Sequence, residues 1–222
     1  MNGNKGPEKP DGLFATVAAG GTWDQAIART LVRPLVGTSV TPNQLTTLRL
    51  LIGLAACALL AAGENALLHV GAGLFLLSNL ADHADGELAR MTGRTSRFGH
   101  FYDLVCDALV HTLVFAALGF GLRNGALGDD AIWLGGVAGI GVGVLFWVFG
   151  HRYRLHGHGG VQPRWLGFDL EDVLYLVVPA IWLGGAVPLL IAAAIGAPIG
   201  VLVMVWQHRR TLFVRGEEGE RV

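Results

Sequence analysis

Long apolar segments separated by short polar ones dominate the sequence from residue 45 onwards. A helix needs about 20 apolar residues to cross about 30 Å of hydrocarbon. Segments of this kind stand between polar boundaries at Leu45–Gly63, Ala66–Arg90, Phe101–Leu122 and Ala131–Phe149. The second becomes acidic at its end, and the third is acidic at its beginning. We expect each of these four segments to be a transmembrane helix.

A further apolar run, Val173–Trp206, is long enough for two helices and is interrupted by Gly184, Gly185 and Pro188. Arginines flank it on both sides. They are Arg152, Arg154 and Arg164 before the run, and Arg209, Arg210, Arg215 and Arg221 after it. Because Lys and Arg gather on the cytoplasmic side of membrane proteins, both flanks belong on that side. The pattern therefore predicts a helical hairpin here, six transmembrane helices in total, and both termini in the cytoplasm.

The residues before the first transmembrane segment predict two further features. Apolar residues alternate with polar ones over Trp23–Val36, which is typical of an amphipathic helix that lies in the membrane interface. Thr41 or Asn43 is placed to cap the following helix, with Pro42 in its first turn. We expect residues 1–21 to be a disordered cytoplasmic tail rather than a cleaved signal, residues 22–210 to be one membrane domain, and residues 211–222 to be a second cytoplasmic tail.

Composition supports a bilayer as the environment of this chain. Of its 222 residues, 52% are hydrophobic and 15% are charged, against roughly a quarter charged in soluble domains. The 33 glycines fall largely inside apolar runs, where small residues let membrane helices approach closely. The formal net charge of -1 gives no support for nucleic-acid binding. Cys57 and Cys106 lie in apolar segments, so we expect no disulfide framework.

Four aspartates stand at the acidic ends of the second and third apolar segments. Asp82 and Asp85 are three residues apart, and Asp103 and Asp107 are four apart, so each pair shares one helical face. Antiparallel packing of the two helices brings the faces together. Arg90 alone cannot neutralise four carboxylates, whereas divalent cations can. The arrangement predicts Mg²⁺ or Mn²⁺, as two ions bridged by a diphosphate, beside a carboxylate that accepts a proton.

Small residues and an arginine accompany the acids. Gly86, Ala89 and Gly99 leave room for a ligand against the backbone, although helix packing is the alternative explanation. Arg90 offers a forked, permanently charged contact to a phosphate oxygen.

The segment from Asp82 to Asp107 resembles the signature of the CDP-alcohol phosphotransferases, D-x2-D-G-x2-A-R-x8-G-x3-D-x3-D. All eight fixed positions agree across 26 residues. The segments Thr41–Thr46 and Ser96–Gly99 also resemble the approaches to the first and third membrane helices of that family.

The resemblance implies a six-helix membrane enzyme, expected to be a homodimer, that transfers a substituted phosphate from a CDP-alcohol to an alcohol acceptor with release of CMP. Asp82, Asp85 and Asp103 would bind metal with help from Asp107, which would also be the general base. The implied nucleotide-binding residues are Asn43, Gly86, Ala89, Arg90, Ser96 and Gly99. We expect CDP-diacylglycerol as donor, in phospholipid biosynthesis at a bacterial inner membrane; the alternative within the family is transfer from a CDP-amino-alcohol to diacylglycerol.

Candidate acceptor contacts lie between the fourth and fifth predicted helices. Arg152, Arg154 and Arg164 suit a phosphorylated acceptor or lipid headgroups. Asp169 and Asp172 would attract a cationic amino-alcohol or complement a helix dipole. Two functions outside this reading also account for intramembrane acids: a small transporter that couples to ions through them, and a catalytically inactive protein of the same fold.

Overall fold

A computed structural model describes residues 23–156 and 170–213 of the chain, and these residues form helices without any strand. In chain order the helices are α2 (Trp23–Val32), the 3₁₀ helix η1 (Arg33–Leu35), α3 (Pro42–Ala62), α4 (Asn65–Thr92), α5 (Arg97–Gly121), η2 (Leu122–Asn124), α6 (Asp130–His156), η4 (Leu170–Leu176), α7 (Val177–Trp182) and α8 (Ala186–Phe213). The expected tails, residues 1–21 and most of 211–222, lie outside the described part of the chain.

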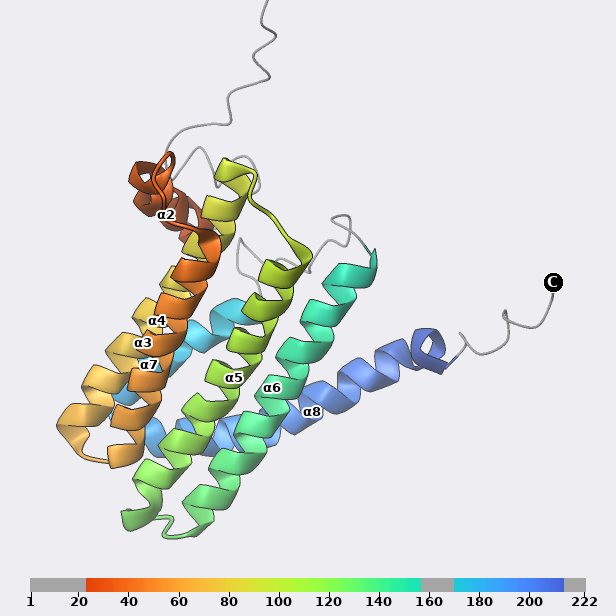
Figure 1. Ribbon diagram of the computed structural model, residues 1–222. Coiled ribbons are helices and arrows are strands. Elements are labelled where there is room, and N and C mark those ends of the chain that lie inside the picture. The colour runs from red at the N-terminus through yellow and green to blue at the C-terminus, as the bar shows by residue number, and fades with distance from the viewer. Residues whose placement is uncertain (1–22, 157–169, 214–222) are drawn as a thin grey trace, which may run out of the picture.

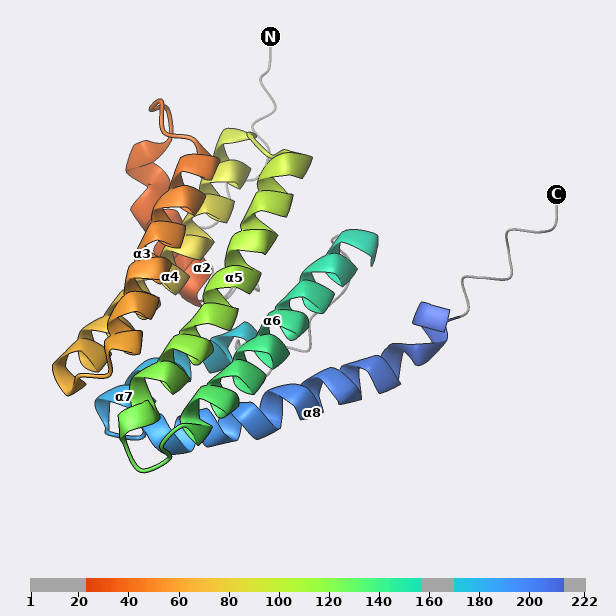
Figure 2. The same cartoon turned by 60° about the horizontal axis from the view of Figure 1, so that its bottom comes forward.

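The long helices α3 to α6 lie side by side and run alternately up and down (Figure 1). Helix α3 packs against both α4 and α5, and α5 packs against α6. Helix α7 packs on α4, while α8 packs on α6 and diverges from the bundle toward its C-terminal end (Figure 2). This order places α3 between α4 and α5, which scarcely contact each other.

Local sequence sets the start of α3, the end of α4 and the start of α5. Thr41 caps α3 in a capping box with Gln44, and Pro42 occupies the first turn, as predicted. Gly93 ends α4 at a φ of 65°, in the left-handed region that costs glycine little. Ser96 then caps α5 by accepting a hydrogen bond from the backbone N–H of Gly99. The turn between α4 and α5 therefore spans only residues 93–96, so the two acidic segments lie at the same end of the bundle, on either side of α3.

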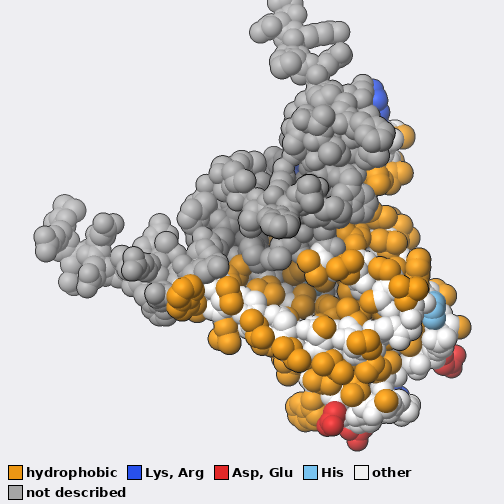
Figure 3. Space-filling model, turned by 180° about the vertical axis from the view of Figure 1, so that it is seen from behind, with side chains coloured by type: hydrophobic (Ala, Val, Ile, Leu, Met, Phe, Trp, Pro, Cys, Tyr) orange, Lys and Arg blue, Asp and Glu red, His pale blue; other side chains and the backbone are white. Residues whose placement is uncertain are grey.

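Four helices among the described residues are long and apolar enough to cross a membrane. They are Pro42–Ala62, Arg97–Asn124, Asp130–Val148 and Ala186–Trp206. Figure 3 shows a broad hydrophobic surface over the described part of one face, with acidic side chains at its lower end. The prediction of an all-helical protein is confirmed for the described residues, and these four candidate spans coincide with segments predicted to cross the membrane.

Two of the six predicted crossings are not among the four spans. Helix α4 has 28 residues, which is sufficient length, but its second half carries four charged residues, namely Asp82, Asp85, Glu87 and Arg90. The apolar helix Val173–Trp182 is shorter than the roughly 20 residues that a crossing needs. The count of six therefore stays a prediction.

The break in the last apolar run lies where the sequence predicted it. Helix α7 ends at Trp182, Gly184 adopts a φ of 78°, and α8 begins at Ala186. The backbone N–H of Gly185 donates to the carbonyl of Ala180 at 2.7 Å, which closes the turn. The indole N–H of Trp182 donates to a carbonyl of α4, that of His69, at 3.0 Å. A side chain thus fixes the hairpin against the bundle.

Helix α2 occupies the segment predicted to be amphipathic. Ala28 and Val32 are buried against Ala84 and Leu88 of α4. The helix therefore packs across the part of α4 that carries the acids, and its position in a membrane interface stays a prediction.

Glycines allow α5 and α6 to approach closely. A Cβ on Gly139 of α6 would clash with the carbonyl oxygen of Thr112 on α5, and Gly119 and Gly135 face each other across the same interface. The prediction that small residues serve helix packing holds for this pair of helices.

Candidate metal and catalytic site

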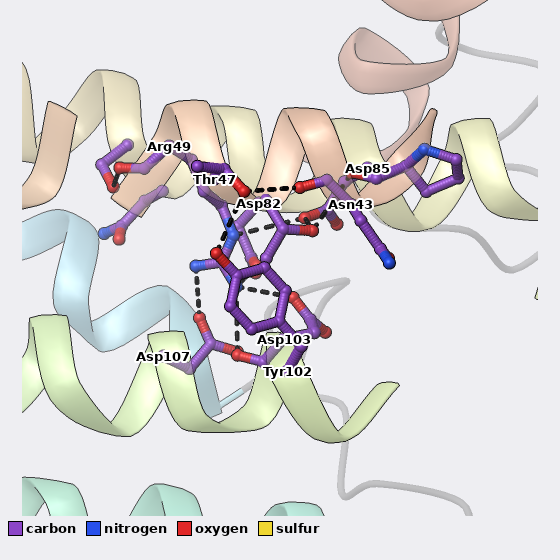
Figure 4. Close-up of polar contacts among 12 residues, drawn as sticks. Asn43, Thr47, Arg49, Asp82, Asp85, Tyr102, Asp103 and Asp107 are labelled. Carbon is purple, nitrogen blue, oxygen red and sulfur yellow. Dashed lines mark hydrogen bonds and ion pairs between the residues drawn. The ribbon is translucent and has the colours of Figure 1, made fainter. Parts of the chain in front are cut away.

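The four aspartates of α4 and α5 converge beside α3, the helix that packs against both. Asp82 and Asp85 come from the last turns of α4, and Asp103 and Asp107 from the first turns of α5 (Figure 4). Asp82, Asp85 and Asp103 each offer one carboxylate oxygen, and these atoms lie within 4.8 Å of one another. The spacings correctly predicted one helical face per pair, but the expectation that α4 and α5 pack on each other was wrong, because α3 packs against both and the two helices scarcely contact each other.

An arginine from a third helix lies at the centre of these carboxylates. Arg49 of α3 is 2% exposed and forms ion pairs with all four acids. Its Nη2 lies 3.0 Å from Asp82 Oδ1 and 2.5 Å from Asp103 Oδ1. Its Nη1 lies 2.7 Å from Asp107 Oδ1, and its Nε lies 3.3 Å from Asp85 Oδ2. A single guanidinium thus bridges both acidic pairs.

Sequence reasoning missed Arg49. The argument that only Arg90 stood near the acids considered the segment from Asp82 to Asp107 and was wrong, because the neutralising arginine comes from α3. A signal was present: Arg49 is a lone charge inside the apolar segment Leu45–Gly63, and a charge at such depth requires a partner.

Two threonines of α3 lie beside the acids, and one of them contacts a carboxylate. The Thr46 hydroxyl donates to Asp85 Oδ2 at 2.6 Å, and both residues are buried. The Thr47 hydroxyl lies 3.0 Å from the hydroxyl of Tyr102. Tyr102 stands one position before Asp103, and Figure 4 shows its hydroxyl directed toward Thr47. Helix α3 therefore contributes to the site as much as the two acidic helices do.

The donor set suits a small hard cation. Four carboxylates against one guanidinium leave three formal negative charges, and acid oxygens are the ligands that Mg²⁺ and Mn²⁺ prefer. Opposite oxygens around Mg²⁺ lie about 4.2 Å apart, from bond lengths of about 2.1 Å. The observed spread of up to 4.8 Å needs only a small inward movement of the side chains. Asp107 is not in this group of three ligands.

Exposure differs among the acids in a way that separates their roles. The side chain of Asp85 is 5% exposed and that of Asp107 is 16% exposed. Those of Asp82 and Asp103 are 25% and 32% exposed. The open side of the site is therefore formed by Asp82 and Asp103, while Asp85 is enclosed.

The expected nucleotide contacts fall into two groups beside the acids. Gly99 lies next to the side chains of Asn43 and Ser96, since a Cβ on Gly99 would come within 2.9 Å of Asn43 Oδ1 and 3.0 Å of Ser96 Oγ. Gly86 lies next to the guanidinium of Arg90, one turn further along α4. Their binding of nucleotide stays a prediction.

Ala89 and Arg90 complete the expected nucleotide set. Ala89 is partly buried, and its carbonyl accepts the hydrogen bonds that end α4. Arg90 has a side chain that is 54% exposed and pairs with Glu87 at 3.0 Å. The expected acceptor residues are not placed: Arg164 and Asp169 lie outside the described residues, and the side chains of Arg152, Arg154 and Asp172 are likewise not described.

Comparison with known families matches residues 39–209 to CDP-alcohol phosphatidyltransferase, which is most of the chain and all of the site. The chain belongs to this family. Two curated relatives agree with the assignment, each named a bifunctional IPC transferase and DIPP synthase. The protein of Aquifex aeolicus (strain VF5) is 35% identical over 123 residues, and that of Thermococcus kodakarensis (strain ATCC BAA-918 / JCM 12380 / KOD1) is 31% identical over 128 residues.

The matches cover 52% and 54% of this chain but only 28% of each relative. The phosphatidyltransferase family assignment confirms the resemblance that the aspartate spacing indicated and favours an enzyme over an ion-coupled transporter.

Proposed function

We propose that this protein catalyses metal-dependent transfer of a substituted phosphate group from a CDP-alcohol to an alcohol acceptor, with release of CMP. The observation that carries the proposal is the convergence of Asp82, Asp85 and Asp103 at one end of an apolar helix bundle, within a sequence that belongs to the CDP-alcohol phosphatidyltransferase family.

Asp82, Asp85 and Asp103 would hold Mg²⁺ or Mn²⁺ in this reaction. When bound, the metal would neutralise the donor's diphosphate and make its phosphorus more electrophilic. The chain supplies the carboxylate oxygens, and packing of α4 and α5 against α3 sets their positions. Thr46 and Arg49 orient the carboxylate of Asp85, which is the least exposed of the ligands. Arg90, which is half-exposed near Gly86, is suited to a phosphate oxygen of the donor.

Asp107 is proposed as the general base. It stands one turn along α5 from Asp103, lies outside the group of three ligands, and has a partly exposed side chain. Its Oδ1 accepts a hydrogen bond from Arg49 Nη1 at 2.7 Å, which fixes the orientation of the carboxylate. From this position Asp107 would take the proton of the acceptor hydroxyl as that oxygen attacks the β-phosphorus, and CMP would leave.

The substrates are proposed from the surroundings of the site. The acids lie at the ends of helices whose outer faces carry exposed Leu, Ile, Val and Trp side chains, a setting that suits a lipid substrate. We propose CDP-diacylglycerol as the donor, in phospholipid biosynthesis, and a homodimer with the site on the cytoplasmic side of a bacterial inner membrane. The alternative donor within the family is a CDP-amino-alcohol, with diacylglycerol as the acceptor.

The test is CMP release by the purified protein with Mg²⁺ or Mn²⁺. One arm uses CDP-diacylglycerol with a panel of alcohols, and the other uses soluble CDP-alcohols with diacylglycerol or with phosphorylated alcohols. We expect one arm to release CMP and EDTA to abolish it. If no combination released CMP under either metal, the proposed transfer would be wrong.

Asp107→Asn tests the assignment of the base. Since a positioned base contributes about 10²- to 10⁴-fold, we expect turnover to fall by that factor while CDP still stabilises the protein against heat. Asp129→Asn is the matched control, because Asp129 is exposed in the turn before α6 at the opposite end of the bundle. Full activity of Asp107→Asn would remove this residue as the base.

A further inference from the structure

Arg49 is the most buried large side chain of the site and has a function that metal binding alone does not explain. It is 2% exposed, and its helix carries none of the four acids. Its backbone carbonyl accepts a hydrogen bond from the buried hydroxyl of Ser78 on α4 at 2.9 Å. The residue is therefore fixed at both ends, by α4 at the backbone and by four carboxylates at the guanidinium.

The guanidinium contacts one oxygen of each carboxylate. These atoms are Oδ1 of Asp82, Asp103 and Asp107, and Oδ2 of Asp85. A divalent ion would bind the same carboxylates, so Arg49 and the ion lie within a few ångströms of each other whenever both are present. Two cations at that separation repel, and in a partly buried site the repulsion is screened little.

We propose that Arg49 is the internal counter-cation of the site: it holds the four carboxylates together while no divalent ion is bound, and it lowers the affinity with which the ion binds. The second half of this statement rests on the proposed metal-dependent function. Without Arg49 the metal-free protein would hold four acids in mutual repulsion, and much of that repulsion would be relieved on metal binding. With Arg49 the site is preassembled, and part of the attraction for metal is already satisfied.

The proposal makes opposite predictions for two properties of one variant. Arg49→Gln keeps hydrogen-bond donors but removes the charge, so the variant in EDTA should unfold at a temperature lower than the wild type by roughly 5 °C or more. The same variant should bind Mn²⁺ at least about tenfold more tightly, because the competing cation is gone. A residue that only positions the ligands would lower both stability and affinity.

The experiment measures free Mn²⁺ by electron paramagnetic resonance during titration, and thermal unfolding in EDTA, for the detergent-purified full chain. Arg49→Lys retains the charge, so its Kd for Mn²⁺ should stay within about threefold of the wild type. Arg123→Gln is the control for loss of an arginine charge, since Arg123 lies in η2 at the other end of the bundle and contacts the ring and carbonyl of Phe120. It should leave the Kd unchanged.

Each result decides the proposal. A Kd of Arg49→Gln equal to or weaker than that of the wild type, or unchanged stability in EDTA, overturns it. If Arg49→Gln is folded only with Mn²⁺ and unfolds on chelation, the proposal is supported in its strongest form; if it is unfolded even in saturating Mn²⁺, Arg49 is needed regardless of the ion and the proposal is wrong.

The wild type separates this inference from the proposed function. If the wild type binds no Mn²⁺ but Arg49→Gln does, the counter-cation is supported and the metal dependence of the natural protein is wrong. If neither the wild type nor Arg49→Gln binds Mn²⁺, both the counter-cation proposal and the proposed metal dependence are wrong. If the wild type binds Mn²⁺ but releases no CMP, only the proposed transfer fails.

Discussion

The hydroxyl of Thr46 offers a sharp test of how α3 supports the acids. It donates to Asp85 Oδ2 at 2.6 Å, and the two residues are 3% and 4% exposed. Thr46→Val keeps the shape of the side chain but removes the donor. A hydrogen bond to a charged group contributes about 1.5–3 kcal/mol. The remaining contact of that oxygen, from Arg49 Nε at 3.3 Å, is longer and cannot replace it.

The expected loss of stability is therefore about 1.5–3 kcal/mol. For a chain of this length each kcal/mol corresponds to about 2–4 °C, so thermal unfolding in detergent should shift down by roughly 3–12 °C. Because Asp85 is also a proposed metal ligand and loses an orienting partner, its affinity for Mn²⁺ should fall by about 10- to 100-fold. Both quantities come from one protein preparation, by thermal unfolding and by Mn²⁺ titration.

Thr47→Val is the matched control. Thr47 is the next residue of α3, is exposed, and its hydroxyl contacts the Tyr102 hydroxyl and the Asn43 carbonyl rather than an acid. Its replacement should change stability by no more than about 1 kcal/mol and leave the Mn²⁺ affinity unchanged. If Thr46→Val is no less stable than Thr47→Val, or binds Mn²⁺ as tightly as the wild type, the hydrogen bond to Asp85 does not hold the site together.

Two further predictions concern the scaffold. Gly139→Ala should destabilise the protein by about 1–3 kcal/mol in detergent unfolding, because its methyl group would meet the backbone of Thr112. Gly136→Ala is the control and should be neutral or slightly stabilising, because the added atom meets open space. Equal stabilities of the two variants would show that α5 and α6 separate easily. Trp182→Phe should cost about 0.5–1.5 kcal/mol through loss of the hydrogen bond to the His69 carbonyl, measured in the same assay, and an unchanged unfolding temperature would show that this bond does not fix the hairpin.

Features that depend on neighbouring residues in the sequence could be predicted. The break at Gly184, the cap at Thr41 and the common face of each aspartate pair all follow from spacings of a few residues. The meeting of the two acidic pairs was predicted, but not the way in which it arises: the short turn at Gly93 places the end of α4 and the start of α5 at the same end of the bundle, and α3 packs against both. For the break, the cap and the common faces, local geometry leaves few alternatives.

Features set by packing between distant segments could not be predicted from the sequence. Arg49 lies 33 residues before the first of the acids, and helical periodicity says nothing about which face of α3 meets α4. The sequence likewise did not show that apolar residues of α2 pack on α4; it indicated only that they would face a membrane surface. The apolar character of Val173–Trp206 likewise did not reveal that the segment before Gly184 contains so short a helix.

The two arginines near the acids are suited to different tasks, and their burial explains why. Arg90 is 54% exposed and its ion pair with Glu87 joins residues of one helix, a contact worth about 0–1 kcal/mol. Arg90 can therefore exchange Glu87 for a phosphate oxygen at little cost. Arg49 is enclosed, and taking away its carboxylates would leave an unpaired buried charge, which costs about 3–5 kcal/mol. Under the proposed function the donor phosphate would recruit Arg90, whereas only a competing cation would share the partners of Arg49.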